Sequence, residues 1–184
     1  MLKTMMILKM QGYWAVGSGK GGGNEVDSRI DRDSDGLPYI PGKMLKGLIK
    51  DVCLRLKNAG NSNYDFVDEI FGSATTSGKI YISDARLSPA LRQALLKEEN
   101  AMAKGCLTRN VYSTAIDENG TAKNTSLRGY EVAVPMELQS AVECECQKDV
   151  LERIKMAASK LVYAVGSHKT RGLGEVLIAF EDKA

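Results

Sequence analysis

Apolar positions repeat with helical spacing in two segments of the chain. The first begins at Pro41–Gly42 and ends near Gly60, and its apolar positions are Leu45, Leu48, Ile49, Val52, Cys53 and Leu56. The second spans 148–165, with apolar positions Val150, Leu151, Ile154, Ala157, Ala158, Leu161 and Val162. Steps of three and four residues place these side chains on one stripe of a helix. Both segments are therefore predicted to be amphipathic helices, and shorter helical pieces are expected at 65–71 and 88–103.

Other segments are rich in β-forming residues or alternate between apolar and polar positions, which is typical of strands. They span 2–16, 78–87, 106–116, 129–146 and 175–180. The first has few polar positions and is expected to be a central strand. The resulting order, β–α–β–…–β–α–β, predicts an α+β fold with a ferredoxin-like or RNA-recognition-motif-like plan and inserted loops.

The strands predicted at 106–116 and 129–146 are separated by a polar segment, 117–128. This segment contains Asn119-Gly120, a strong signal for a hairpin turn. A long projecting hairpin is therefore expected at about residues 106–131. Near its base lie Arg109, Tyr112 and Arg128, which suit phosphate contacts and stacking on the bases of single-stranded RNA. An ordinary surface hairpin is the alternative.

The chain has 184 residues, of which 43% are hydrophobic, and this length suits one domain, 1–184, with embellishments. No apolar stretch reaches bilayer length, and the N-terminal apolar run is too short for a secretory signal. We therefore expect no membrane partner and a cytoplasmic location.

Four cysteines are too few for a secreted disulfide scaffold. Cys106, Cys144, Cys146 and the one histidine, His168, offer ligand types that suit zinc. However, Cys144 and Cys146 alternate with Glu143 and Glu145, which would turn both thiols of a strand toward the core. No zinc is expected.

The net charge of +2 is too small to indicate nucleic-acid binding by itself. Basic residues nevertheless cluster on the first helix, where five of them accompany a single acid, Asp51: Lys43, Lys46, Lys50, Arg55 and Lys57. The three lysines nearest the start recur at steps of three and four, so they line one exposed edge.

Two glycine-rich loops are candidates for contacts with phosphate. The first, Gly17–Gly23 (GSGKGGG), fits G-x-G-x-x-G, but an acid-rich loop follows it where a dinucleotide site needs a helix. A plain flexible loop and backbone contacts from Ser18 and Gly19 to RNA phosphates stay open. The second, Gly166–Gly174 (GSHKTRGLG), adds His168, Lys169 and Arg171; a basic loop after a helix is its alternative.

Four aspartates crowd nine residues of the loop before the first helix: Asp27, Asp31, Asp33 and Asp35. Carboxylate oxygens suit Mg²⁺ or Ca²⁺. An EF-hand is excluded, because no glutamate stands where its twelfth ligand belongs. A solvated acidic loop is the alternative.

Six short motifs, taken in order, resemble the landmarks of RAMP-superfamily backbone subunits from type III CRISPR systems. They are Gly36–Gly47 (GLPYIPGKMLKG), Glu69-Ile70-Phe71-Gly72, Gly78–Asp84 (GKIYISD), Thr108-Arg109 with Ile116-Asp117, Leu127-Arg128 with Glu131, and Gly166–Gly174. The resemblance runs from about Gly17 to the final strand. The family opens its first helix with G-x-P-Y-I-P-G-S-S-x-K-G; this chain has Lys43-Met44 in place of the two serines but keeps Lys46.

The resemblance implies a ferredoxin-like palm with Lys46 and Lys50 on the phosphates of a guide RNA (crRNA). It implies that 117–128 is the thumb, which interrupts the guide–target duplex at regular intervals. Copies of the chain would stack head to tail along the guide, beside other CRISPR effector subunits, in a ribonucleoprotein for antiviral defence. Phosphate contacts suit this role, because they carry no sequence information.

Family members that cut target RNA carry an aspartate before the G-x-P-Y motif, and Asp27 is the closest match. The resemblance thus implies that Asp27 binds Mg²⁺ or another divalent ion and acts as the catalytic residue of an endonuclease. Asp31 and Asp33 are further candidates. Three alternatives remain: a structural guide-binding module served by a partner nuclease, a guide-processing endoribonuclease, and an unrelated RNA-recognition-motif-like protein.

Overall fold

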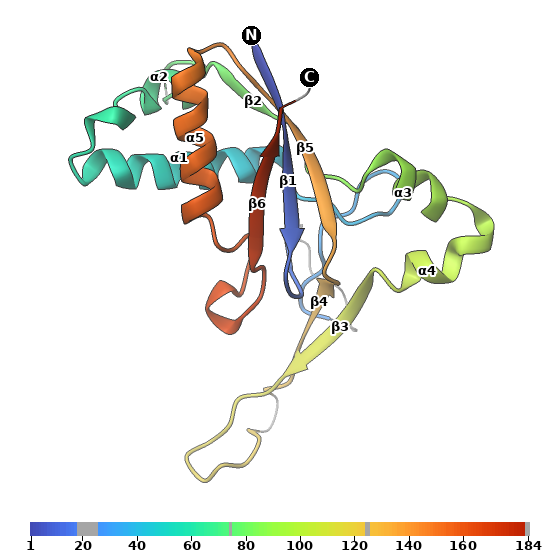
Figure 1. The fold of residues 1–184 in the computed structure, drawn as a ribbon. Coiled ribbons are helices and arrows are strands. Elements are labelled where there is room, and N and C mark those ends of the chain that lie inside the picture. The colour runs from blue at the N-terminus through green and yellow to red at the C-terminus, as the bar shows by residue number, and fades with distance from the viewer. Residues whose placement is uncertain (18–25, 74, 124–125, 183–184) are drawn as a thin grey trace.

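The centre of the molecule is a four-stranded antiparallel sheet with the strand order β2-β5-β1-β6 (Figure 1). The computed structural model describes residues 1–17, 26–73, 75–123 and 126–182. The strands of this sheet are β1 (Leu2–Met10), β2 (Ile80–Ile82), β5 (Glu137–Cys144) and β6 (Val176–Glu181). The first strand is central, as its apolar sequence predicts, although it ends six residues earlier than expected. This strand order belongs to a ferredoxin-like palm.

Two long helices cover one face of the sheet, α1 (Gly42–Asn58) and α5 (Lys148–Leu161) (Figure 1). Their apolar stripes point inward, with Leu45, Ile49 and Ile154 almost fully buried. Alternate residues of the central strand, including Met6 and Leu8, complete this core. Both helices thus form where the periodicity predicts them, because burial of one stripe stabilises each.

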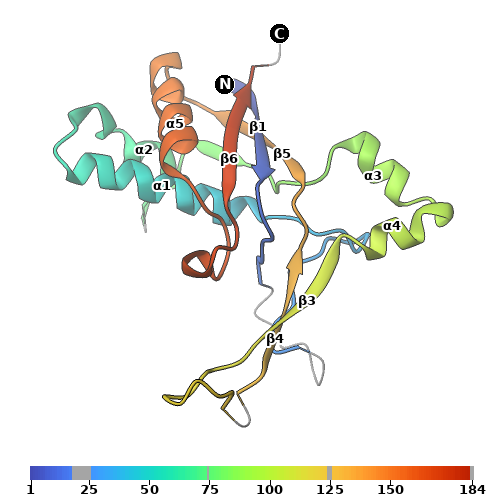
Figure 2. The ribbon, with the colours of Figure 1, turned by 60° about the horizontal axis from the view of Figure 1, so that its bottom comes forward.

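Shorter helices form two groups at the two sides of the sheet (Figures 1 and 2). Beside α1 lie the 3₁₀ turn η1 (Ser62–Tyr64) and α2 (Val67–Phe71); on the other side lie α3 (Pro89–Leu95), η2 (Glu98–Asn100) and α4 (Ala101–Gly105). The prediction of one helix over 88–103 is wrong, because the helix ends at Leu95 and Lys97 has extended dihedral angles, φ −69° and ψ 140°. The Ser88 side chain caps α3 by accepting a hydrogen bond from Leu91 N–H.

The projecting hairpin is a separate two-stranded sheet of β3 (Thr108–Ser113) and β4 (Arg128–Ala133). It extends away from the palm in both views (Figures 1 and 2). One long strand over 129–146 is predicted, but the chain divides it into β4 and β5 around Pro135. Proline lacks the N–H that a ladder needs, so it interrupts the strand there.

The hairpin base is fastened to the palm by the segment that follows β1. Trp14 is fully buried; its backbone pairs with Ala133, and its indole N–H donates to Val134 O at 3.0 Å.

In the described part of the chain, no helix has the length and apolar character needed to span a bilayer.

Candidate nucleic-acid interface

The glycine-rich loop 166–174 connects α5 to β6 and packs tightly against the chain after β1. Gly166 and Gly174 have φ angles of 91° and 80°, and a Cβ on them would lie 2.2 Å from Ala15 O and 2.0 Å from Val165 O. Only glycine fits both the backbone angle and the space. The short 3₁₀ turn η3 (Lys169–Arg171) lies within this loop.

His168 joins this loop to the hairpin. Its ring stacks on that of Tyr130 in β4, with 4.7 Å between ring centroids and 23° between ring planes. Its backbone is left-handed, with φ 57° and ψ 28°, a conformation that costs energy for a residue with a Cβ. The hydrogen bonds of Arg171 N–H and Leu173 N–H to His168 O, at 2.9 and 3.3 Å, help to fix the turn. The stack therefore couples the hairpin and the glycine-rich loop, which are separate candidates in the sequence.

An open cavity of about 370 Å³ lies between the hairpin and the glycine-rich loop. Two exposed arginines, Arg128 and Arg171, line it together with Tyr130 and small, mainly hydroxyl-bearing residues: Ser113, Thr114, Ala115 and Ser126. Guanidinium groups and hydroxyls are the side chains that contact phosphate and sugar in nucleic-acid complexes. The structure thus brings Arg128 and Arg171 together as the sequence could not.

The predicted RNA-binding residues of β3 lie beside this region. Arg109 donates a hydrogen bond to the Tyr13 hydroxyl at 2.5 Å, and its guanidinium carbon lies 5.1 Å from the centre of that ring. Tyr112 pairs across the hairpin with Gly129, where an added Cβ would come within 2.9 Å of its ring. Tyr112 thus covers a glycine of β4, yet 54% of its surface is exposed.

Asp27 lies at the same hairpin base, on a segment that runs alongside β4. Its N–H donates to Gly129 O at 2.7 Å, and its Oδ2 accepts from Gly129 N–H at 2.9 Å. Glu131 N–H donates to Ser28 O at 3.0 Å and continues the pairing. Asp27 itself is exposed. The candidate catalytic carboxylate and the candidate stacking residue Tyr112 therefore flank the same glycine.

A pair of charged residues, Glu131 and Arg32, holds this segment against the hairpin. The Glu131 carboxylate accepts two hydrogen bonds from Arg32, at 2.7 and 3.1 Å, and one from Ile30 N–H at 3.2 Å. Arg32 also donates to Thr108 Oγ1 at 2.9 Å, so one guanidinium contacts both hairpin strands. Bidentate hydrogen bonds between an arginine and a carboxylate are among the stronger ones in proteins, because both groups are charged.

Asp33 has a structural role. Only 1% of its side chain is exposed, and it forms ion pairs with Arg92 and, at 3.1 Å, with Arg86. It also accepts from the N–H groups of Asp35 and Leu37, at 2.9 and 3.1 Å. Burial raises the pKa of Asp33, but the hydrogen bonds from Arg92 and the backbone outweigh burial and leave this pKa below its usual value.

The chemistry of the acidic loop limits what it offers to a divalent ion. The described residues contain no group of three or more His, Cys, Asp or Glu side chains placed to hold a metal. Asp35 is also occupied by Arg92. Asp27 therefore supplies a single carboxylate, which fits Mg²⁺ only if water and RNA phosphate oxygens complete its ligands, as is common for this ion.

The side chains of Cys53 and Cys144 are buried, and burial raises the pKa of both thiols to about 12.

The lysines of α1 occupy a different position from the arginines. Lys46 donates to Ile80 O at 3.0 Å, and Lys50 donates to Gly72 O at 2.6 Å, so both ammonium groups bind backbone carbonyls beside the edge strand β2. Lys43 is exposed at the start of the helix. The glycine-rich loop lies by β6, at the opposite edge of the sheet, although its Lys169 lines a small hollow with Arg55 of α1.

Two predicted contacts, Ser18 and Gly19, lie outside the described residues. Tyr130 was missed as a site residue, because an aromatic in a strand carries no signal of its own. Glu131 was noted as part of a motif with Leu127-Arg128 but was given no role in the site. The stack with His168 and the pair with Arg32 become visible only when the chain is folded.

Comparison with known proteins supports the fold and the family. A search of curated proteins found no match to the sequence. Two solved structures share the fold with a TM-score of 0.71 each: the type III-B Cmr-beta complex bound to cognate target RNA and its apo state. Their matching chains are 13% and 15% identical to this one; the matches cover 98% and 97% of this chain and 97% of each of theirs. The model of the RAMP superfamily matches residues 8–176. This chain belongs to the RAMP superfamily.

Proposed function

We propose that this chain is a guide-RNA-binding backbone subunit of a type III CRISPR effector complex. The observation that carries the proposal is the cavity between the hairpin and the glycine-rich loop, which Arg128 and Arg171 line together with Tyr130, the ring that stacks on His168. It lies on a fold shared with chains of the type III-B Cmr-beta complex, one of whose structures contains target RNA.

The composition of this cavity suits an RNA strand of any sequence. Two guanidinium groups attract phosphate, and the hydroxyl of Ser113 adds a hydrogen bond that does not depend on the base. The hydroxyls of Thr114 and Ser126 contact each other at 2.7 Å and shape the wall of the cavity. An exposed aromatic ring, Tyr112, stands on the outer strand of the hairpin and offers a surface for stacking. A subunit that accepts every guide needs these contacts and no base-specific ones.

Target cleavage through Asp27 is the finer part of the proposal. Its support is the exposed carboxylate beside the hairpin base, on a segment fixed by backbone pairing to β4 and by Glu131. Asp27 would orient the 2′-hydroxyl of a bound nucleotide or hold a divalent ion, which would supply charge stabilisation at the phosphate. A structural subunit without cleavage remains the alternative that the experiments below separate.

Guide binding is tested by purifying the tagged chain from cells that contain a type III CRISPR array and analysing the RNA that accompanies it. Guide RNA of defined length is expected. The double variant Arg128→Ala/Arg171→Ala should retain at least tenfold less RNA, because two phosphate contacts are lost. Exposed Lys97→Ala on the far helical group is the matched control. Equal RNA on both variants would contradict the assignment of this interface.

Cleavage is tested with the purified complex and a complementary target RNA, with Mg²⁺ and with EDTA. Cuts at even spacing that require the metal are expected, and Asp27→Asn should abolish them while target binding stays within about twofold. Cuts that persist in Asp27→Asn would remove this residue from the reaction. Absence of cuts from the unmodified complex would favour the purely structural subunit.

A further inference from the structure

A second cavity lined by cations lies where the acidic loop and α4 meet the base of the hairpin. It has a volume of about 270 Å³, and its polar lining consists of Arg32, Lys104 and the hydroxyl-bearing Thr108. Two glycines, Gly36 and Gly105, leave parts of its wall without side chains. Among the described residues that line it, none is acidic. Its chemistry therefore suits an anion such as phosphate.

Both cations have N–H groups left for a ligand. Arg32 donates two hydrogen bonds to Glu131 and one to Thr108 Oγ1, which use three of its five N–H groups and fix the guanidinium in place. Lys104 is half-buried, and its Nζ lies 3.5 Å from the position that a Cβ on Gly36 would take. Within the described part of the chain, no hydrogen bond or ion pair engages the Lys104 ammonium. A phosphate oxygen would thus meet a fixed guanidinium and an available ammonium.

The carboxylates near this cavity are already neutralised. Asp33 and Asp35 of the acidic loop are both paired with arginines. Glu131 balances the charge of Arg32, since the two side chains form an ion pair at 2.7 Å. The net positive charge of the cavity therefore comes from Lys104, and binding of an anion depends mainly on this residue.

The two cavities lined by cations lie on opposite faces of the hairpin. Thr108 lines the cavity beside α4, and Ser113, at the other end of β3, lines the cavity that contains Arg128 and Arg171. Side chains an odd number of positions apart on a strand point to opposite faces, and these two are five positions apart. At about 3.3 Å per residue they are also about 16 Å apart along the strand. The hairpin base thus offers separate phosphate sites to two strands.

We infer that the cavity beside α4 binds a phosphate group of the target RNA, while the guide RNA occupies the opposite face of the hairpin. The inference rests on the proposed function, which assigns the cavity of Arg128 and Arg171 to the guide. Arg32 follows Asp27 by five residues, on the segment that pairs with β4. One segment therefore carries both the candidate catalytic carboxylate and a ligand for the phosphate of the strand to be cut.

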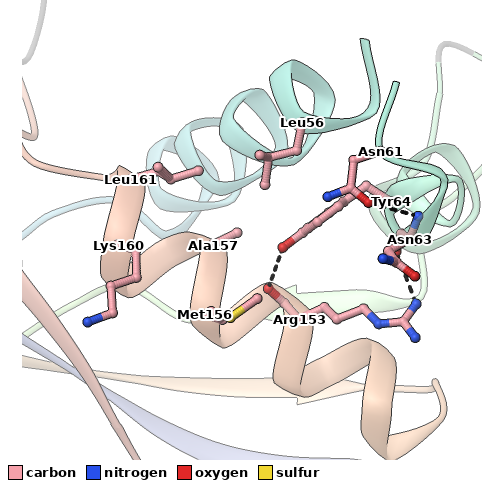
Figure 3. A pocket seen from close by; sticks show the side chains of 9 residues that line it. All are labelled: Leu56, Asn61, Asn63, Tyr64, Arg153, Met156, Ala157, Lys160 and Leu161. Carbon is pink, nitrogen blue, oxygen red and sulfur yellow. Dashed lines mark hydrogen bonds between the residues drawn. The ribbon is translucent and has the colours of Figure 1, made fainter. Parts of the chain in front are cut away.

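A larger cavity elsewhere supplies a matched control. The groove between α1 and α5 has a volume of about 430 Å³, and Tyr64, Leu56 and Ala157 give it an apolar floor (Figure 3). Lys160 lines this groove and, like Lys104, has no hydrogen bond or ion pair within the described part of the chain. Figure 3 shows its ammonium directed away from the Tyr64 ring. Lys160→Ala thus removes the same charge from a surface that is not assigned to RNA.

The test measures the affinity of the purified complex, loaded with its guide, for a complementary target RNA at several salt concentrations. Lys104→Ala should weaken target binding about fivefold and reduce the slope of log affinity against log salt by about 0.7–0.9, because one phosphate contact is lost. Lys104→Arg should restore most of the affinity, since it keeps the charge. Lys160→Ala should leave affinity and slope unchanged. Each variant should retain as much guide RNA as the unmodified chain.

The possible outcomes separate this inference from the proposed function. Unchanged affinity and slope in Lys104→Ala would overturn the inference and leave the proposed function standing. An equal loss in Lys160→Ala would also overturn it, because the effect would then reflect net charge alone. Loss of guide RNA from Lys104→Ala would assign the cavity to the guide instead of the target. An unmodified chain that carries no guide RNA would refute the proposed function, and the inference with it.

Discussion

Two aspartates of one loop, Asp27 and Asp33, have opposite environments. Asp33 is buried beneath two arginines and accepts two backbone hydrogen bonds. Asp27 is exposed and accepts one, from Gly129 N–H at the hairpin base. The first fixes the loop to Arg86 and to α3, and the second lies where the loop meets the hairpin. The loop therefore separates a structural carboxylate from one that is exposed to solvent.

This difference shows why the position of an acid in the fold matters more than its position in the sequence. Both residues belong to the same acidic run and match a metal-binding composition equally well. Only the fold supplies cations to one of them, and a carboxylate that is already paired has little capacity left for a metal ion. Variants that exchange these roles test the comparison directly.

Replacement of Asp33 should have the largest effect on stability. Asp33→Ala removes the partner of Arg92 and leaves the N–H groups of Leu37 and Asp35 without an acceptor, and loss of such a network costs about 2–4 kcal/mol. The measurement is the free energy of unfolding in urea. Asp35→Ala is the control, because its side chain is 36% exposed and shares Arg92 with Asp33. Similar losses for both variants would contradict the central role of Asp33.

The pKa of Asp33 gives a prediction on pH. Because its pKa in the folded protein is below the usual 3.8, the stabilisation is fully present above that value and is lost as the pH falls through the lower folded pKa. The unmodified chain should therefore lose more stability than Asp33→Ala between about pH 5 and pH 2.5. Urea unfolding at several pH values measures this difference. Parallel curves for the two chains would show that Asp33 does not titrate with folding.

Replacement of Glu131 tests whether the end of the loop that carries Asp27 is held to the hairpin independently of the Asp33 network. Glu131→Ala removes the acceptor of Arg32 and of Ile30 N–H, and we expect a loss of about 1–2 kcal/mol in the free energy of unfolding. Glu143→Ala is the control, because the Lys3–Glu143 pair has side chains that are 60% and 31% exposed and should contribute less than about 0.5 kcal/mol. An equal effect of the two substitutions would show that the pair of Glu131 and Arg32 does not stabilise the loop against the hairpin.

The sequence was sufficient to predict the elements that have strong periodicity. Both amphipathic helices, the central first strand and the projecting hairpin are confirmed by the structure. The division of the strand at 129–146 was missed because Pro135 lies within an otherwise continuous β-forming run. Proline interrupts a strand only where the sheet requires a hydrogen bond from its missing N–H, and the hydrogen-bond pattern of the sheet is known only once the chain is folded.

The candidate site was less predictable for a different reason. Arg86 and Arg92 lie 53 and 59 residues from Asp33 in the sequence, and no local pattern joins them. Tyr130 and His168 are likewise brought together only by the packing of the glycine-rich loop against the hairpin. The types of residue in the interface were visible in the sequence, whereas their partners required the tertiary structure.

Asp27 should show the smallest effect on stability. Asp27→Asn keeps an oxygen that accepts from Gly129 N–H, and the residue is exposed, so the free energy of unfolding should change by less than about 0.5 kcal/mol. Under the proposed function the same substitution abolishes cleavage of target RNA. A residue whose removal leaves folding and binding intact but ends the reaction acts on the substrate. A loss of stability similar to that of Asp33→Ala would instead make both aspartates structural, and the division of the loop would fail.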